Sequence, residues 1–523
     1  MSNGTARSAP AESLAARAEE LRARAAVLGR ALAARARGRT SLACERAVLR
    51  LCGVGGLSTG GRPLALDVLD RLGGAGPGAL GRGVGLPFAL ASIEYGLDPQ
   101  QLALDVAAGH IDLATEGELL GDEAVRREAQ RTLEGWLAVA FERFDANRTA
   151  RRELIGMLGE PREPWIGSDV GAFDAREAAS EAAALVTSGA DLLRVRVPRD
   201  AEIRRGPREA SGDSDWPVGP TAPPPAGSQR GLSLLRAALD DAATRSGRYP
   251  RLATSWLGLA APEQAVVAGF ERVDVVCSDP LEAVFGLGVD PDRAFADHAF
   301  AQALLTRAGC HLFLGPGPLV APEGGLGADL DPATRAGRAL ALQAVGLGFA
   351  LDNGVPAERI SLGAVPPAAF VGGGSGAHAL AEVALRGLVF PEHALVFDEH
   401  LSETADESLA PALLAWAAGG ARFRAVISPA ARSHVAAATG AIRGAMVAAR
   451  FLADGREVGS LRGPALEHAG ATLDAAAATL AALERDGFEA FVGPGEANHV
   501  GAAGLAERDS GAPAIEVLLH PQA

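Results

Sequence analysis

From residue 160 onward, short apolar segments alternate with helical patterns. The segments with strand character are Trp165–Ser168, Leu192–Val197, Arg251–Ser255, Val273–Cys277, Cys310–Leu314, Ile360–Val365, Ala394–Asp398 and Phe423–Ser428. The helical patterns lie at about 174–188, 229–246, 263–270, 291–308, 332–352, 377–388 and 405–418, with another from about 431. Apolar strands joined by helix-length connections favour a parallel sheet that is buried on both faces. Eight such units predict a (β/α)8 TIM barrel, and an open doubly wound sheet is the competing arrangement.

The segments on either side of the barrel are predicted to be helical. Residues 1–155 form an N-terminal helical region, in which Ser13–Arg37 is the first expected helix. The barrel occupies residues 160–430, and residues 431–523 form a C-terminal helical extension and tail. A long loop at 199–231, rich in Pro, Gly and Ser, interrupts the barrel after its second strand. Its composition favours disorder, and a functional lid is the alternative.

Charge and cysteine content exclude several classes of protein. The net charge of −15 argues against a nucleic-acid partner. The four cysteines form no CxxC pair, so the sequence indicates neither a disulfide framework nor a zinc ribbon. We find no secretory signal and no run of about 20 apolar residues that could cross a membrane. We therefore expect a soluble, cytoplasmic protein without a metal site.

Polar residues at the ends of the predicted strands are the candidates for a functional site, because barrel chemistry is carried by the loops that follow the strands. They are Ser168, Asp169, Arg196, Ser255, Ser278, Asp279 and Asp398 through His400. His400 and Asp398 are the candidate catalytic residues, since neighbouring carboxylates can raise the pKa of an imidazole. Arg196, Ser255, Ser278 and Asp279 are the candidate cofactor-binding residues. Ordinary capping of a loop is the alternative role for each of these residues.

Four stretches of the chain resemble the α subunit of lysine 5,6-aminomutase and its ornithine 4,5-aminomutase relatives. They are ERAVLRLCGV at 45–54, SGADLLRVRV at 188–197, the segment Gly247–Asp279, and GVPAERISLGAV at 354–365. The resemblance runs from about residue 40 to 480 in the same order and spacing. It implies a TIM-barrel subunit of an enzyme that uses adenosylcobalamin and pyridoxal phosphate. Such an enzyme moves an amino group between adjacent carbons of a basic amino acid by a radical mechanism.

The resemblance also implies a smaller, cobalamin-binding β subunit as partner. In the family that subunit carries the Schiff-base lysine and the D-x-H-x-x-G histidine that ligates cobalt. This chain contains no lysine, since all 49 Lys+Arg residues are arginine. Its nearest approach to the cobalamin motif is Asp398–Glu399–His400, in which Glu403 stands where the motif has glycine. Because a Schiff base requires a lysine amine, another chain would have to anchor pyridoxal phosphate.

The family builds the barrel side of its pyridoxal site from arginine, serine, tyrosine and an acidic–amide pair. Matching the flanking sequence places these ligands at Val197, Glu202, Leu257, Glu282, Leu287, Leu319 and Val320, with Glu282 at the position of the stacking tyrosine. A phosphate dianion needs cationic or N–H donors, which a leucine side chain does not supply. Two functions therefore follow: an aminomutase subunit, or a non-catalytic paralogue that acts as a scaffold or regulator.

Overall fold

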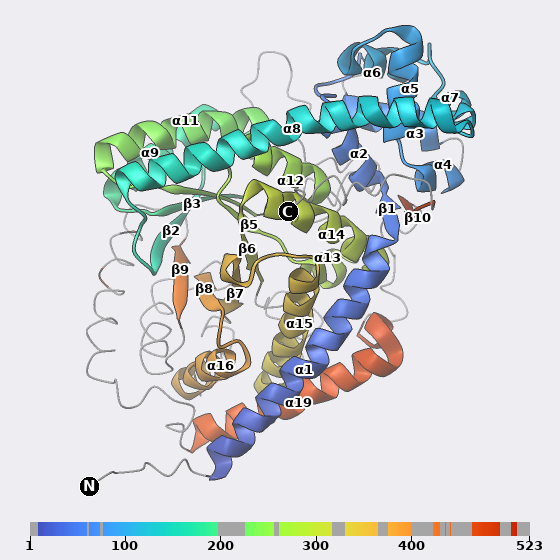
Figure 1. The fold of residues 1–523 in the computed structure, drawn as a ribbon. Coiled ribbons are helices and arrows are strands. Elements are labelled where there is room, and N and C mark those ends of the chain that lie inside the picture. Colours follow the sequence, from blue (N-terminus) through green and yellow to red (C-terminus); the bar gives the residue numbers. More distant parts are fainter. Residues whose placement is uncertain are drawn as a thin grey trace.

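A closed barrel of eight parallel strands forms the centre of the protein (Figure 1). The computed structural model describes residues 9–59, 62–73, 77–196, 225–255, 261–315, 330–364, 375–398, 422–428, 435, 440, 463–491 and 504–509. The barrel strands are β2 (Trp165–Val170), β3 (Leu192–Arg196), β4 (Arg251–Ser255), β5 (Val275–Cys277), β6 (His311–Leu314), β7 (Ile360–Ala364), β8 (Ala394–Asp398) and β9 (Phe423–Ser428). They follow one another in sequence order, and β9 pairs with β2 to close the ring. The predicted (β/α)8 barrel is therefore confirmed, and the open sheet is excluded.

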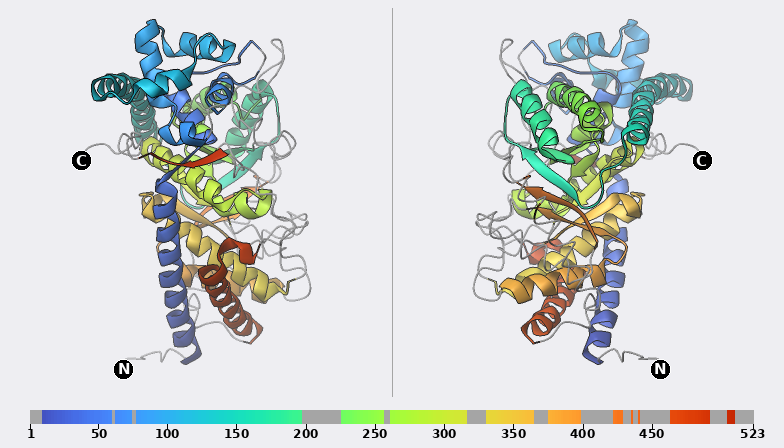
Figure 2. Two further views of the ribbon diagram at one scale, coloured as in Figure 1. Left: turned by 90° about the vertical axis from the view of Figure 1, so that its right-hand side faces the viewer. Right: turned by 90° about the vertical axis from the view of Figure 1, so that its left-hand side faces the viewer.

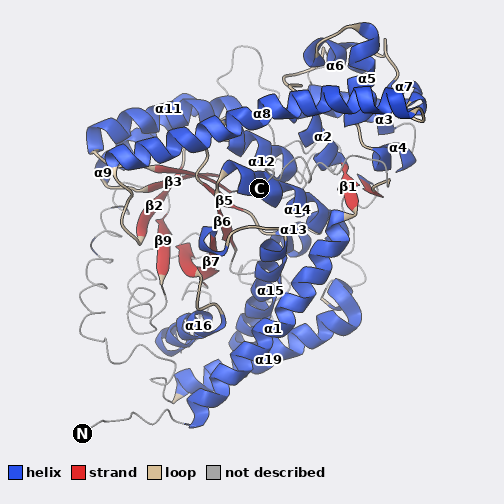
Figure 3. Ribbon diagram, viewed as in Figure 1, coloured by secondary structure: helices blue, strands red, loops and turns tan. Residues whose placement is uncertain are grey.

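The helices of the barrel cover the outside of this ring (Figure 3). They are α9 (Ala175–Ser188), α11 (Gln229–Ser246), α12 (Ala261–Phe270), α14 (Pro291–Ala308), α15 (Pro332–Asp352) and α16 (Ser375–Val389), with an additional α13 (Pro280–Leu287) after β5. Most of them begin after an Asp or Ser whose side chain accepts an N–H of the first turn, as Asp174 does for α9 and Ser228 for α11. The helices predicted at 405–418 and from about 431 lie outside the described residues, as do residues 199–224 of the predicted loop.

The interior of the barrel is packed in layers. An apolar layer in the middle of the barrel includes Leu192, Ala253, Val275, Phe313, Val396 and Ala425. At the amino-terminal end of the strands, the fully buried ring of Trp165 lies 4.2 Å from the Arg251 guanidinium carbon and 5.6 Å from that of Arg424. Glu160 and Glu163 pair with these two arginines. This end of the barrel is therefore closed by paired charges around one aromatic ring.

Helices from both ends of the chain pack together beside the barrel (Figure 2). The N-terminal helices are α1 (Ala9–Arg37), α2 (Leu42–Leu51), α3 (Leu64–Gly73), α4 (Pro77–Arg82), α5 (Gly85–Tyr95), α6 (Pro99–Ala108), α7 (Leu113–Leu119) and α8 (Glu123–Leu158), and α19 (Pro464–Asp486) lies near the C-terminus. The predicted helix at Ser13–Arg37 is α1, which packs on α15 and α19. Glycines allow α1 and α15 to approach closely, because a Cβ at Gly29 would lie 2.5 Å from the backbone N of Phe349.

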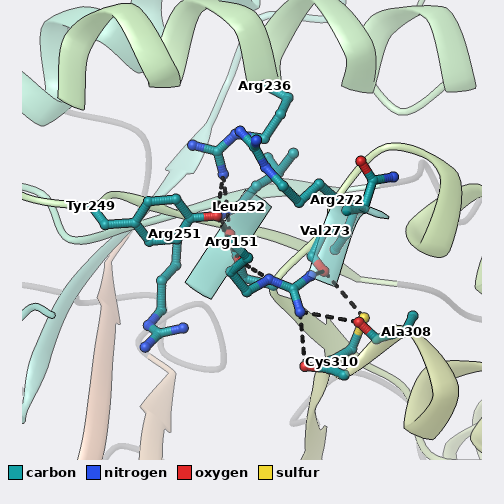
Figure 4. A network of polar contacts seen from close by, with 12 residues as sticks. Arg151, Arg236, Tyr249, Arg251, Leu252, Arg272, Val273, Ala308 and Cys310 are labelled. Carbon is teal, nitrogen blue, oxygen red and sulfur yellow. Dashed lines mark hydrogen bonds and ion pairs between the residues drawn. The ribbon is translucent and has the colours of Figure 1, made fainter. Parts of the chain in front are cut away.

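Two short strands pair an early segment of the chain with a late one, and one buried carboxylate joins helix α8 to the barrel. Strand β1 (Arg39–Ser41) pairs antiparallel with β10 (Leu505–Glu507). Helix α8 is fastened to the barrel through Arg151, which pairs with Asp274 just before β5. Figure 4 shows the polar network around Arg151 and Arg236. None of the helices in the described part of the chain has the length and apolar character needed to cross a membrane.

Asp274 is surrounded by donors from several segments. Its carboxylate pairs with the Arg151 Nε of α8 at 2.7 Å and the Arg236 Nη1 of α11 at 3.1 Å. It also accepts the Tyr249 hydroxyl at 2.9 Å and the backbone N–H of Leu252 at 2.8 Å. Burial alone would raise the pKa of Asp274, but Arg151 and Arg236 outweigh burial and lower it below its ordinary value. The carboxylate is therefore ionised and holds two buried arginines in place.

Candidate functional site

A cluster of charged side chains lies at the carboxyl-terminal end of the barrel strands. Arg194 of β3 is buried and contacts carboxylates from two other strands. Its Nε donates to Asp169 Oδ1 of β2 at 2.6 Å, and its Nη2 donates to Asp398 Oδ1 of β8 at 3.0 Å. A further contact joins Arg194 Nη1 to Asp398 Oδ2, so this second pair is bidentate. We call these three residues the Asp169–Arg194–Asp398 cluster.

The register of the strands explains why these residues meet. Asp169 and Arg194 are direct partners on the neighbouring strands β2 and β3, and their side chains occupy the same layer. Asp398 comes from β8, which β9 and β2 separate from β3. Arg194 therefore contacts one carboxylate on the neighbouring strand β2 and reaches across part of the barrel mouth to a second on β8. An arginine suits this position, because its planar fork can hold two carboxylates at once.

In the cluster, two carboxylates surround one guanidinium. Burial opposes the charge on Arg194, but Asp398 and Asp169 outweigh burial and raise its pKa well above the ordinary value. Arg194 therefore stays protonated at any pH at which the protein is folded. The side chain of Asp398 is 22% exposed, whereas that of Asp169 is 5% exposed. Asp398 is therefore the member of the cluster that a ligand in the barrel mouth can reach.

The end of β5 places three more side chains at this edge. Burial raises the pKa of the Cys277 thiol to about 11, although the nearby Arg194 opposes that rise. Cys277 is therefore a neutral thiol at pH 7 and not a thiolate nucleophile. Ser278 is buried, and its hydroxyl has no hydrogen-bond partner among the described residues. Asp279 caps α13 by accepting the N–H of Leu281 at 2.9 Å, and burial raises its pKa to about 7.

Several residues predicted to form the site lie at the ends of neighbouring strands. Arg196 and Ser255 are partners at the ends of β3 and β4, Ser255 is the partner of Cys277, and Ser278 follows directly. These residues therefore share one edge of the barrel with Asp398. The side chain of Arg196 and the whole of His400 lie outside the described residues, as do Val197, Glu202, Leu257, Leu319, Val320 and the side chain of Leu287. Of the positions matched to family ligands, Glu282 is described, in the first turn of α13.

Arg194 is the residue that the sequence analysis missed. A signal for it was present, because a charged residue interrupts the apolar strand segment LLRVRV at its third position. A buried arginine must be paired, so its presence implied carboxylates nearby, and Asp169 and Asp398 were already among the strand-end candidates. Among the residues that the structure describes, no three His, Cys, Asp or Glu side chains are arranged to hold a metal ion.

The fold and the cluster define a TIM-barrel protein with a charged site at the carboxyl-terminal end of its strands, where barrel enzymes carry their chemistry. Residues 14–397 match the family described as the D-lysine 5,6-aminomutase TIM-barrel domain of the alpha subunit, and the chain belongs to this family. The resemblance inferred from the sequence is thereby confirmed.

Relatives of known function give the same family. The chain is 29% identical over 331 residues to the lysine 5,6-aminomutase alpha subunit of Fusobacterium nucleatum, a match that covers 62% of this chain. It is 28% identical over 333 residues to the alpha subunit of the same name from Acetoanaerobium sticklandii. Each match spans 59% of the length of the relative. Among solved structures, a dihydropteroate synthase of Burkholderia cenocepacia matches 56% of this chain and 94% of its own at 16% identity, with a TM-score of 0.34. That score is too low to carry a functional argument.

Proposed function

We propose that this chain is the barrel subunit of a lysine 5,6-aminomutase-type enzyme, which moves an amino group between adjacent carbons of a basic amino acid by a radical mechanism. Family membership supports the reaction class. The observation that carries the proposal for this chain is the Asp169–Arg194–Asp398 cluster, which places a partly exposed carboxylate, Asp398, where a barrel enzyme binds its substrate. A substrate with a second ammonium group matches that charge.

The residues present do not form a complete pyridoxal phosphate site within this chain. The sequence has no lysine for a Schiff base. Arg194 already pairs with two carboxylates, so it is poorly suited to bind a phosphate dianion as well. The motif at Asp398–His400 likewise lacks the glycine of the cobalamin motif. Both adenosylcobalamin and pyridoxal phosphate would therefore be anchored mainly by a smaller cobalamin-binding β subunit, in a complex that we place in the cytoplasm.

In this proposal the barrel binds and orients the amino-acid substrate. Asp398 accepts a hydrogen bond from a substrate ammonium group. The two contacts with Arg194 fix the orientation of the Asp398 carboxylate. A hydrogen bond to a charged group contributes about 1.5–3 kcal/mol. The hydrogen bond to Asp169 also holds Arg194 in place, so the orientation of Asp398 is fixed before the substrate binds.

Substitution of Asp398 tests this function in the complex with the partner subunit. We expect Asp398→Asn to raise the KM for a diamino acid by about tenfold or more, from the loss of a charged hydrogen bond. Asp174→Asn is the matched control at the same end of the barrel, because asparagine retains the capping contacts of Asp174 to α9. Equal KM values for the two variants would show that the cluster does not bind the substrate.

The second candidate is a non-catalytic paralogue that serves as a scaffold or regulator. It is supported by Glu282, an acid at the position matched to the stacking tyrosine of the family. An absorption spectrum of the co-expressed complex separates the two candidates. Uptake of pyridoxal phosphate together with amine migration would exclude the paralogue. A complex that assembles in size-exclusion chromatography but remains colourless would exclude the enzyme, and two separate peaks would contradict the proposed partner.

A further inference from the structure

A pocket lies between the N-terminal helices and the helices of the barrel. Its volume is about 510 Å³, within the range of roughly 300–1,000 Å³ of small-molecule sites. Its walls come from the end of α2 and the turn after it, from α8, and from Gln229 of α11 and Phe270 of α12. It shares no lining residue with the Asp169–Arg194–Asp398 cluster. Helix α8 runs along both parts of the molecule (Figure 1). Its residues Trp136, Val139, Ala140 and Arg143 line one side of the pocket.

The turn after α2 is shaped by a glycine and fixed by one side chain. Gly53 has a φ of +97°, a conformation that favours glycine, and it redirects the chain at the end of the helix. Gln100 then fixes the turn through both amide atoms, because its side chain accepts the Gly55 N–H at 3.0 Å and donates to the Gly55 carbonyl at 2.9 Å. This wall of the pocket is therefore preformed.

Two guanidinium groups are held at the pocket by a chain of hydrogen bonds. Arg50 donates to Gln229 at 2.8 Å, and Gln229 donates to Glu271 at 2.8 Å. Arg143 donates to the same Glu271 oxygen, also at 2.8 Å. Glu271 is the carboxylate in this chain of contacts, and it does not line the pocket. Of the described residues that line the pocket, Arg50 and Arg143 are charged and none is acidic.

The remaining lining is mostly apolar and includes two aromatic side chains. Trp136 and Phe270 contribute flat surfaces, and the guanidinium carbon of Arg143 lies 4.7 Å from the centre of the Phe270 ring. Val139, on the same stretch of α8, is 68% exposed. An exposed apolar side chain beside fixed cations matches a ligand that is apolar over most of its surface and anionic at one end.

We propose that this pocket binds a small anionic molecule with a flat apolar body, at a site separate from the barrel mouth. The anionic group pairs with Arg143 and Arg50, and the apolar body lies against Trp136 and Phe270. The ligand would contact both the N-terminal helices and the barrel, so its binding links the two parts of the chain.

The full-length chain can be tested with 8-anilinonaphthalene-1-sulfonate, whose fluorescence rises in apolar sites. N-phenyl-1-naphthylamine has the same body without the sulfonate and should bind at least tenfold more weakly, about the effect of losing one charged hydrogen bond. Arg143→Gln should weaken binding of the sulfonate by a similar factor. Arg152→Gln, on the exposed part of the same helix, is the matched control and should leave the affinity unchanged.

A second pair of variants tests charge without altering packing. Val139→Asp should bind the sulfonate several-fold more weakly than Val139→Asn, because the two side chains differ in charge at one exposed position. Unchanged unfolding curves will show that all variants are folded. Equal affinities for Val139→Asp and Val139→Asn, or wild-type affinity in Arg143→Gln, would overturn the proposal. Equal binding of the neutral probe would show an apolar site without selectivity for anions.

Discussion

The contribution of Asp274 to stability can be predicted from its surroundings. In Asp274→Asn, Arg151 and Arg236 lose the carboxylate that pairs with both of them, while the amide oxygen can still accept the N–H of Leu252. Both arginines are buried. Removing one partner from a buried ion pair costs about 3–5 kcal/mol, because the remaining charge is left uncompensated. Arg151 keeps its hydrogen bonds to backbone carbonyls in the variant, such as the one to Val273 at 2.7 Å, and these still stabilise part of its charge. We therefore expect Asp274→Asn to lower the free energy of unfolding by about 3 kcal/mol, the lower end of that range.

Urea unfolding followed by circular dichroism measures this loss. The control is Asp474→Asn, which breaks the pair of Asp474 with Arg17, where the carboxylate side chain is 78% exposed. An exposed pair contributes about 0–1 kcal/mol, so the control should barely shift the transition. Adding Arg151→Met to Asp274→Asn should recover part of the loss by removing the guanidinium left without its carboxylate, whereas Arg236 keeps its pair with Asp240 at 3.0 Å. A loss below about 1 kcal/mol in Asp274→Asn, or no recovery in the double variant, would refute the reasoning.

The pH dependence of the same variant, and three other substitutions or reactions, give further tests. Because the folded-state pKa of Asp274 is lowered, its stabilising effect is complete above the unfolded pKa of about 3.9 and disappears as pH falls through the folded value, so wild type and Asp274→Asn should converge in acid. The pKa of Asp279 is raised to about 7, so ionisation disfavours folding as pH rises; Asp279→Asn, which keeps a capping side chain, should gain stability over wild type between about pH 4 and 7 in thermal melts. Gly29→Val should lower the melting temperature more than Gly135→Val, because a Cβ at Gly29 meets the backbone of α15 whereas the space around Gly135 is open. Alkylation of Cys277 at pH 8 should be slow, with the rate still rising above pH 9, since the thiol pKa is about 11; a rate that levels off near pH 8 would contradict the burial argument.

The barrel could be predicted from the sequence because each strand is a short apolar run between helical patterns. Arg251–Ser255 and Ala394–Asp398 have the same bounds in the structure as in the prediction. Helix α13 was missed, since Pro280–Leu287 is short and directly follows a strand. Its start could have been read from Asp279, an N-cap residue immediately before a proline.

The candidate site was predictable in position but not in its contacts. Strand ends such as Asp169, Ser255 and Asp398 could be placed at one edge, because parallel strands bring their carboxyl ends together. The contact between Arg194 and Asp398 depends on how far apart β3 and β8 lie around the closed ring, and spacing along the chain does not give that distance. The pairing of Asp274 with Arg151 is likewise a long-range contact, made by a helix outside the barrel.

The pairing of β1 with β10 has a consequence for the order of folding. Arg39 faces Glu507, and the N–H of Arg508 donates to the carbonyl of Gly38 at 2.9 Å, so an early segment of the chain depends on a very late one. Closing so long a loop costs little more free energy than closing a shorter one, because the entropic penalty grows only logarithmically with length. The delay is kinetic, since a ribosome releases β1 long before β10. During synthesis β1 therefore has an open edge that could pair with another nascent chain, and co-translational aggregation should decrease when residues 504–509 are supplied in trans as a peptide.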